Sequence, residues 1–257
     1  MNQTLVPILW VAMALPTLLL IQRWIHRHLH GVSLLAAGKA ERAVALYALI
    51  LLPGVLLHEV SHWLMATFVG VRTGSFSLWP RPQADGSVQL GYVEYYKGRT
   101  LGPIRESLIG GAPLLAGTAV ILLIGFRVFG VADLTTAVQS GDVNSLATAL
   151  DSLFQTNDFL VWLYLLFAIG NGMMPSRSDR RAWPAFLLIL GGTAVLLAVL
   201  GIEKVIFAGV ANLAAAIFGY LGLALSMIIA VDIIFILVIL LVEELLSRIR
   251  GSEVVYR

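Results

Sequence analysis

Cysteine is absent from this chain of 257 residues, which excludes disulfide bridges and thiolate metal ligands. Charged residues are also scarce: they form 12% of the sequence, against about 25% in a typical soluble domain. The formal net charge is only +2, and the sequence has no basic tract that would indicate a nucleic-acid partner. A chain with so few charges cannot cover a soluble surface, so the composition excludes an ordinary soluble domain.

Apolar residues dominate instead: 59% of the sequence is hydrophobic, and the mean hydropathy is +0.89. A helix needs about 20 mainly apolar residues to cross a bilayer. The apolar runs therefore predict an all-α polytopic membrane protein of about six transmembrane helices, forming one membrane-embedded domain over residues 1–257. The first run lacks a preceding basic segment and a following cleavage site, so we expect a retained helix. Five spans are predicted at Leu5–Ile21, Ala43–Val69, Ser107–Phe129, Phe159–Met174 and Pro184–Leu200.

The final apolar run, Val205–Leu246, is too long for one straight span. It predicts either two spans or an interfacial helix followed by one long span. In both cases we expect a break in the helix near Gly219–Gly222.

Lys and Arg in short loops predict the orientation, because such loops are enriched on the cytoplasmic side. The basic segments Gly70–Glu106 and Pro175–Trp183 and the C-terminus are expected to be cytoplasmic. The acidic segment Val131–Asp158 is expected outside, lying along the interface. This arrangement favours a single crossing by the final run and thus six spans. It leaves one disagreement, because the basic segment Gln22–Arg42 would then lie outside.

The stretch Ser75–Tyr96 has a different pattern from its apolar surroundings. Asp85-Gly86 is a hairpin turn signal, and apolar side chains then alternate with polar or small ones over residues 88–92. We expect a small β-hairpin here, directly after the second predicted span.

The strongest chemical signal is the sequence His58-Glu59-Val60-Ser61-His62 inside the second predicted span. Two histidines four apart on a helix share one face, so both imidazoles can reach one zinc ion, with Glu59 beside it to take a proton from a bound water. Ionisable residues in an apolar helix are costly unless they are paired or coordinated. The alternative is a structural cluster in which these side chains pack against neighbouring helices.

A catalytic zinc needs a third protein ligand and an open position. Asp179 is the best candidate, because it follows the predicted inner end of the fourth span, and the second span also ends on that side. From position alone, Asp179 is as well explained as an exposed loop residue among three arginines. It is preceded by Asn171 and Pro175.

The two motifs together resemble the site-2 protease family of intramembrane metalloproteases. The family pairs an HExxH helix with a later Asn-x-x-Pro-x-x-x-x-Asp-Gly type segment, and Asn171, Pro175 and Asp179 have a related spacing. The resemblance covers a catalytic core of about residues 43–183, with extra helices in residues 1–42 and 184–257. It implies that Asp179 is the third zinc ligand and that the β-hairpin follows the first motif. It also implies cleavage of transmembrane protein substrates near the cytoplasmic face.

This chain departs from the family pattern at the flanks of the aspartate. Ser178 and Arg180 stand where the family usually has Leu and Gly. The glycine-rich motif of the family is matched loosely by residues 110–117, and close helix packing alone accounts for that segment.

The expected chemistry is peptide hydrolysis at one Zn²⁺ ion per chain. The ion lowers the pKa of its water toward about 7, Glu59 takes the proton and later returns it to the leaving amine, and Asn171 helps stabilise the oxyanion. The strand that contains Gln89 and Leu90 is expected to pair with the locally unwound substrate by β-augmentation. In the alternative interpretation, the hairpin only covers the mouth of the site.

Two other functions remain open: a pseudoprotease that binds membrane helices without cleaving them, and a metal transporter. Intact Glu59 argues against the first, and the absence of an internal repeat argues against the second. Asp232, in the last apolar run, must face protein or water; it either hydrogen-bonds the active-site helices or pairs with a polar group such as Asn212. A cluster of three histidines indicates either a second metal site or lipid-headgroup contacts: His26, His28 and His30.

Overall fold

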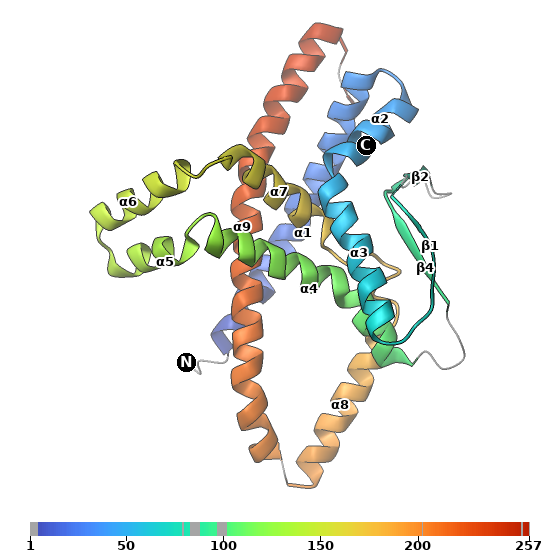
Figure 1. Cartoon of the computed structure of the whole chain (residues 1–257), viewed down its shortest axis with the longest axis vertical. Helices are drawn as coiled ribbons and strands as arrows, with labels where there is room; N and C mark the ends of the chain where they lie inside the picture. Colours follow the sequence, from blue (N-terminus) through green and yellow to red (C-terminus); the bar gives the residue numbers. More distant parts are fainter. Residues whose placement is uncertain are drawn as a thin grey trace.

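The computed structural model describes residues 5–78, 80–82, 88–96, 102–201, 203–252 and 254–256. It is mostly helical, with four short strands between the third and fourth helices (Figure 1). The helices are α1 (Leu5–Ala37), α2 (Ala40–Ile50), α3 (Leu52–Phe68), α4 (Pro103–Arg127), α5 (Val131–Ser140), α6 (Val143–Phe154), α7 (Phe159–Gly172), α8 (Trp183–Val199) and α9 (Glu203–Arg250). The strands are β1 (Thr73–Ser77), β2 (Arg81–Pro82), β3 (Val88–Gln89) and β4 (Tyr92–Tyr95).

By length and composition, three helical segments among the described residues are candidate membrane spans: Leu5–Ala37, Pro103–Arg127 and Gly209–Arg250. The number rises to five if two bent pairs, α2 with α3 and α6 with α7, each count as one span. α8 is apolar but has only 17 residues. The prediction of a mostly helical protein with apolar helices of membrane-spanning length is therefore confirmed, whereas the six spans are not.

The second predicted span is broken into two helices, α2 and α3, that meet at an angle of 70°. Pro53 stands in the first turn of α3, where its missing N–H is harmless. In a continuous helix its ring would clash with the carbonyl of Leu49, so α2 ends before it. The bend makes α3 a separate short helix, and α3 carries the His-Glu-His motif.

The first and last helices are both longer and more regular than predicted. α1 runs past Ile21 to Ala37 and ends only at Gly38, which adopts a left-handed conformation with φ of +70°. The predicted break near Gly219–Gly222 is wrong, because α9 continues through it. Gly222 instead allows α1 to approach α9 closely, because a Cβ at Gly222 would come within 2.9 Å of the Trp10 ring.

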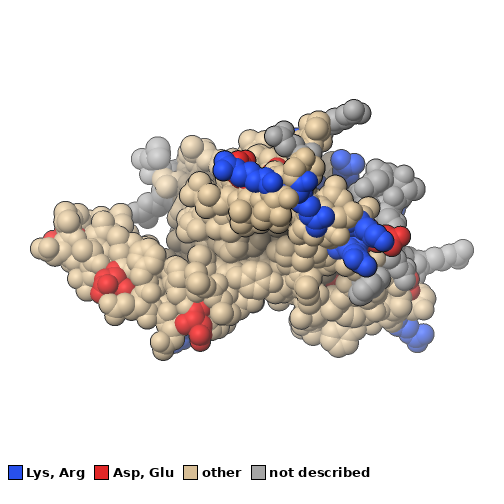
Figure 2. All heavy atoms as spheres, turned by 90° about the horizontal axis from the view of Figure 1, so that it is seen from above, with Lys and Arg blue, Asp and Glu red and all other residues tan. Residues whose placement is uncertain are grey.

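α1 and α9 pack along each other and finish at the same end of the molecule (Figure 1). There, the Arg250 guanidinium donates to the Ala36 carbonyl over 2.8 Å. The expected orientation put the segment Gln22–Arg42 and the C-terminus on opposite sides of the membrane, and this contact shows that both cannot be right. Figure 2 looks onto this end, where Lys and Arg side chains gather, while acidic side chains mark the projecting α5–α6 pair.

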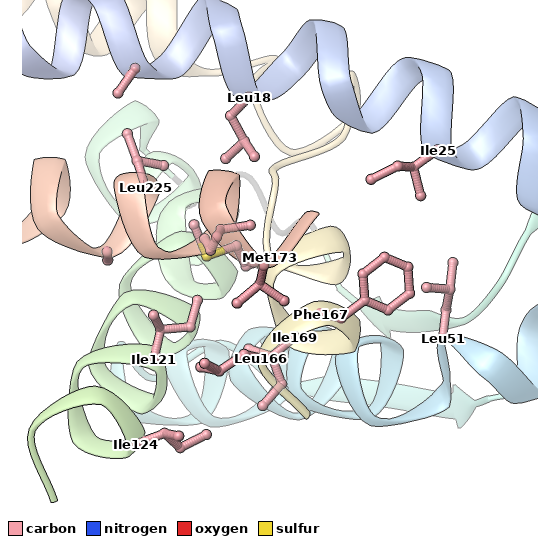
Figure 3. Close-up of a cluster of buried hydrophobic side chains, with 14 of the residues drawn as sticks. Leu18, Ile25, Leu51, Ile121, Ile124, Leu166, Phe167, Ile169, Met173 and Leu225 are labelled. Carbon is pink, nitrogen blue, oxygen red and sulfur yellow. The ribbon is translucent and has the colours of Figure 1, made fainter. Parts of the chain in front are cut away.

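The core surrounds α7, which lies among α1, α3, α4 and α9 (Figure 3). Phe167 is 1% exposed and stacks on Phe235 with a distance of 4.0 Å between the ring centroids. Close approach of α3 and α7 requires glycine, since a Cβ on Gly54 would collide with the Ala168 carbonyl. The end of α7 is therefore held directly against the helix that carries the motif.

The predicted hairpin is present in the described residues as two antiparallel pairs, β1 with β4 and β2 with β3. Phe76 lies opposite Val93, and Arg81 lies opposite Gln89. The predicted turn at Asp85-Gly86 falls outside the described residues.

Candidate metal centre

Two imidazoles and one carboxylate meet beside α3. His58 and His62 lie one turn apart on that helix, and their Nε2 atoms are 3.1 Å from each other. Asp179, from the connection between α7 and α8, places Oδ2 at 3.6 Å from His58 Nε2 and Oδ1 at 3.4 Å from His62 Nε2. Among the residues that the structure describes, only this His/Asp group is close enough to hold a metal ion.

Both imidazoles are oriented by backbone carbonyls. His58 Nδ1 donates to the Gly172 carbonyl at the end of α7, and His62 Nδ1 donates to the Ile109 carbonyl in α4, each over 2.8 Å. Because a carbonyl only accepts, the ring proton of each neutral histidine stays on Nδ1. Each Nε2 therefore presents a lone pair to the same point, as in metal-binding histidines.

This arrangement of acceptors fits a metal ion. Two lone pairs and a carboxylate within 3.6 Å of one another repel unless a cation lies between them. Ligands bound at about 2.0–2.1 Å in a tetrahedral zinc site are about 3.3–3.4 Å apart. The three separations in this site are 3.1, 3.4 and 3.6 Å, so one ion can be held by all three residues with little movement.

Asp179 is held in place by the turn that precedes α8. The backbone N–H of Ser176 donates to Asp179 Oδ2 over 2.6 Å, and the N–H of Asp179 donates to the Ser176 hydroxyl. Burial opposes ionisation of this carboxyl, but the two neighbouring imidazoles and the Ser176 N–H hold the pKa of Asp179 well below its usual range. Asp179 is therefore a carboxylate at neutral pH.

Gly110 lets this turn approach α4. A Cβ at Gly110 would collide with the backbone carbonyl of Asp179, whereas a Cβ at the next residue, Gly111, would meet nothing within 4 Å. The loose glycine-rich match at residues 110–117 is thus explained by close packing against the Asp179 turn and, at Gly117, against Met173.

We expect Gly110→Ala to weaken metal binding by about 10–100-fold, the size of effect typical when support for a ligand is removed. The added methyl must push the Asp179 turn away from the two imidazoles. Gly111→Ala is the matched control and should leave metal affinity unchanged. Competition with a chelator measures both variants. Equal affinities in the two would show that Gly110 does not position Asp179.

Glu59 lies on the same helix between the two histidines and is 7% exposed. The segment between β3 and β4 packs onto it: a Cβ at Gly91 would be 2.9 Å from Glu59 Cγ and 3.1 Å from its Oε1. The hairpin therefore touches the predicted catalytic base directly. Leu90 is partly buried against the hydrophobic core, and the backbone of Gln89 pairs with Arg81.

Asn171 is not part of the His/Asp cluster. Its side-chain amide donates to the Phe167 carbonyl over 3.0 Å and to Asp232 Oδ1 over 2.8 Å, so both amide protons are used within the core. Asp232 thus hydrogen-bonds α7, one of the helices predicted to hold the site, which was one of the two alternatives left open by the sequence. The predicted oxyanion role of Asn171 would require at least one of these bonds to break.

The three histidines of α1 have protein partners in place of a shared metal. His26 Nδ1 pairs with the Tyr47 hydroxyl over 2.7 Å. His28 Nδ1 lies 2.8 Å from Glu243 on α9, and His30 packs edge-on against Tyr47. The described part of the chain has no second metal-binding group at these residues.

No protein-family model, no curated protein and no solved structure matches this chain. The fold and the site define a helical protein with membrane-length apolar helices and a His/His/Asp group that is suited to a metal ion.

Proposed function

We propose that this protein is an intramembrane zinc endopeptidase that hydrolyses peptide bonds of transmembrane protein substrates. The observation that carries the proposal is the convergence of His58 Nε2, His62 Nε2 and the Asp179 carboxylate at 3.1–3.6 Å, with both Nδ1 protons committed to carbonyls. The same donor set also suits ferrous iron. Glu59, in the position of a general base, favours hydrolysis and therefore zinc.

Each residue then has a defined task. His58, His62 and Asp179 would hold the zinc, which would supply a bound water with a pKa lowered toward about 7. Glu59, which lies beside this group, would accept a proton from the water that attacks the scissile carbonyl. Glu59 then gives the proton to the leaving amine, so one carboxylate acts first as base and then as acid. The Gly172 and Ile109 carbonyls keep both imidazoles in the metal-binding tautomer throughout.

The surroundings of the site support a substrate that lies within the membrane. α3 and α4 are apolar helices, and the metal centre lies between them beside the buried end of α7. Lys and Arg gather at the end where α1 and α9 finish, which favours a cytoplasmic location for that end. The resemblance to site-2 proteases supports cleavage toward the cytoplasmic side.

The short segment between β3 and β4 is suited to holding an unwound substrate. Gly91 lies directly against Glu59, so a peptide paired with this segment would lie beside the proposed catalytic base. Freed substrate amides need hydrogen-bond partners where water is scarce, and a strand edge supplies them without a sequence requirement.

Replacing Gln89, in β3, or Leu90, in the segment that follows it, with Pro removes one backbone N–H donor. We expect cleavage to fall at least about tenfold with one of the two variants, while zinc content and thermal stability stay unchanged. Undiminished cleavage by both folded variants would remove the pairing role and leave the hairpin as a cover for the site.

The proposed activity is tested by comparing membranes that contain the wild-type protein with membranes that contain Glu59→Gln. Mapping of new protein termini by mass spectrometry should find cuts within or beside transmembrane segments only with the wild type. If the two membranes give the same termini although zinc is bound, the protein binds metal without being a peptidase.

A further inference from the structure

The C-terminal turn of α7 is held by side chains from other helices. The last carbonyls of a helix have no partner within it, and in an apolar interior water does not replace one. Gln22 Nε2 of α1 donates to the Gly170 carbonyl, and His58 Nδ1 of α3 donates to the Gly172 carbonyl, each over 2.8 Å. The carbonyl that orients His58 is thus part of a larger arrangement.

Asn171 links this turn to α9. It lies between Gly170 and Gly172, is 6% exposed, and donates to Asp232 Oδ1 over 2.8 Å. Asp232 is fully buried. The Asn171–Asp232 pair therefore joins α9 to the residue next to the carbonyl that His58 uses. Loss of this bond would free the end of α7 and the His58 ring together.

Two oxygens of this pair lack a hydrogen-bond donor among the described residues: Asp232 Oδ2 and Asn171 Oδ1. An ionised carboxylate with a bare oxygen is very costly at this depth. A proton on Asp232 Oδ2 removes the charge and supplies the donor that Asn171 Oδ1 needs. The two side chains then form an acid–amide pair with one bond in each direction.

We propose that Asp232, as a neutral carboxylic acid paired with Asn171, is a positioning residue for the metal centre. The pair fixes the last turn of α7, the turn fixes the Gly172 carbonyl, and the carbonyl fixes the direction of His58 Nε2. This inference rests on the metal centre of the proposed function and does not require peptidase activity.

The test follows zinc transfer from purified, zinc-loaded protein to a chelator, in the Glu59→Gln background so that no cleavage interferes. Asp232→Ala and Asn171→Ala should each speed zinc loss by about 10–100-fold. The double variant should be no faster than either single one, because both remove the same bond. Ser33→Ala is the matched control: Ser33 is fully buried in α1 and its hydroxyl donates to the Leu29 carbonyl of the same helix, so its loss should not change the rate.

Two further variants separate positioning from general stability. Asp232→Asn keeps the pairing without a charge, because an amide N–H replaces the acid O–H as the donor to Asn171 Oδ1. The exchange Asn171→Asp with Asp232→Asn reverses the acid and the amide. Both should release zinc within about twofold of the wild-type rate and keep the wild-type visible spectrum after Co²⁺ substitution. The Ala variants should shift that spectrum, because the His58 ring turns.

Rapid zinc loss from Asp232→Asn would overturn the neutral-acid assignment. If Asp232→Ala loses zinc at the wild-type rate and keeps the wild-type cobalt spectrum, the positioning role is overturned. If Asp232→Ala does not fold, rapid zinc loss from the variant with Asn171→Asp and Asp232→Asn overturns it instead. Zinc binding without any peptide cleavage would contradict the proposed function but leave this inference standing.

Discussion

Replacing Glu59 with Gln is expected to abolish peptide cleavage while the metal stays bound. Glu59 lies between the two histidines but is not a member of the metal-binding group, so the amide leaves the ligands intact. The amide introduced by Glu59→Gln cannot take a proton from a metal-bound water, so the general base is lost. Loss of a general base typically costs about 10²–10⁴-fold, and we expect at least that loss in the rate of cleavage of a transmembrane substrate reconstituted in vesicles.

The control for this experiment is Glu41→Gln, the same change at an exposed residue in the first turn of α2. It should leave both cleavage and zinc content unaltered. Full activity in Glu59→Gln, with metal present, would show that the proposed chemistry is wrong.

Replacing both His58 and His62 with Ala is expected to remove the metal and all metal-dependent activity. Asp179 alone cannot retain a zinc ion, since stable sites use three or four protein ligands. The change also leaves the part-buried Gly172 carbonyl and the buried Ile109 carbonyl without their donors, so a loss of about 1–3 kcal/mol of stability per site is expected as well.

Circular dichroism therefore accompanies the metal analysis, to show that the variant still folds. His30→Ala is the control, because His30 contacts Tyr47 and not the metal-binding group. Stoichiometric zinc in the folded double variant would exclude α3 as the metal-binding helix.

The part of the site that the sequence predicts well is the part set by one helix. His58, Glu59 and His62 need only helical spacing to share a face, and α3 supplies it. Asp179 was assigned through the family resemblance and not through its position, because its approach depends on a turn packed against Gly110. The sequence gives no local sign of that contact.

Contacts between distant helices account for what the sequence did not predict. The donors to Gly172 and Ile109 and the pairing of Asn171 with Asp232 join segments that no local pattern connects. The bend at Pro53 could have been predicted from the proline alone. The continuity of α9 could not, because glycine weakens an isolated helix, whereas Gly222 here allows the close approach of Trp10.

The metal content of the purified protein, with and without Asp179, tests the central claim most directly. Mass spectrometry that counts zinc and iron, on protein prepared without chelators, should find about one zinc per chain in the wild type. Asp179→Ala should hold well below one zinc, although both histidines remain. A wild-type protein without metal, or an Asp179→Ala protein that retains a full zinc equivalent with unchanged affinity, would contradict the account.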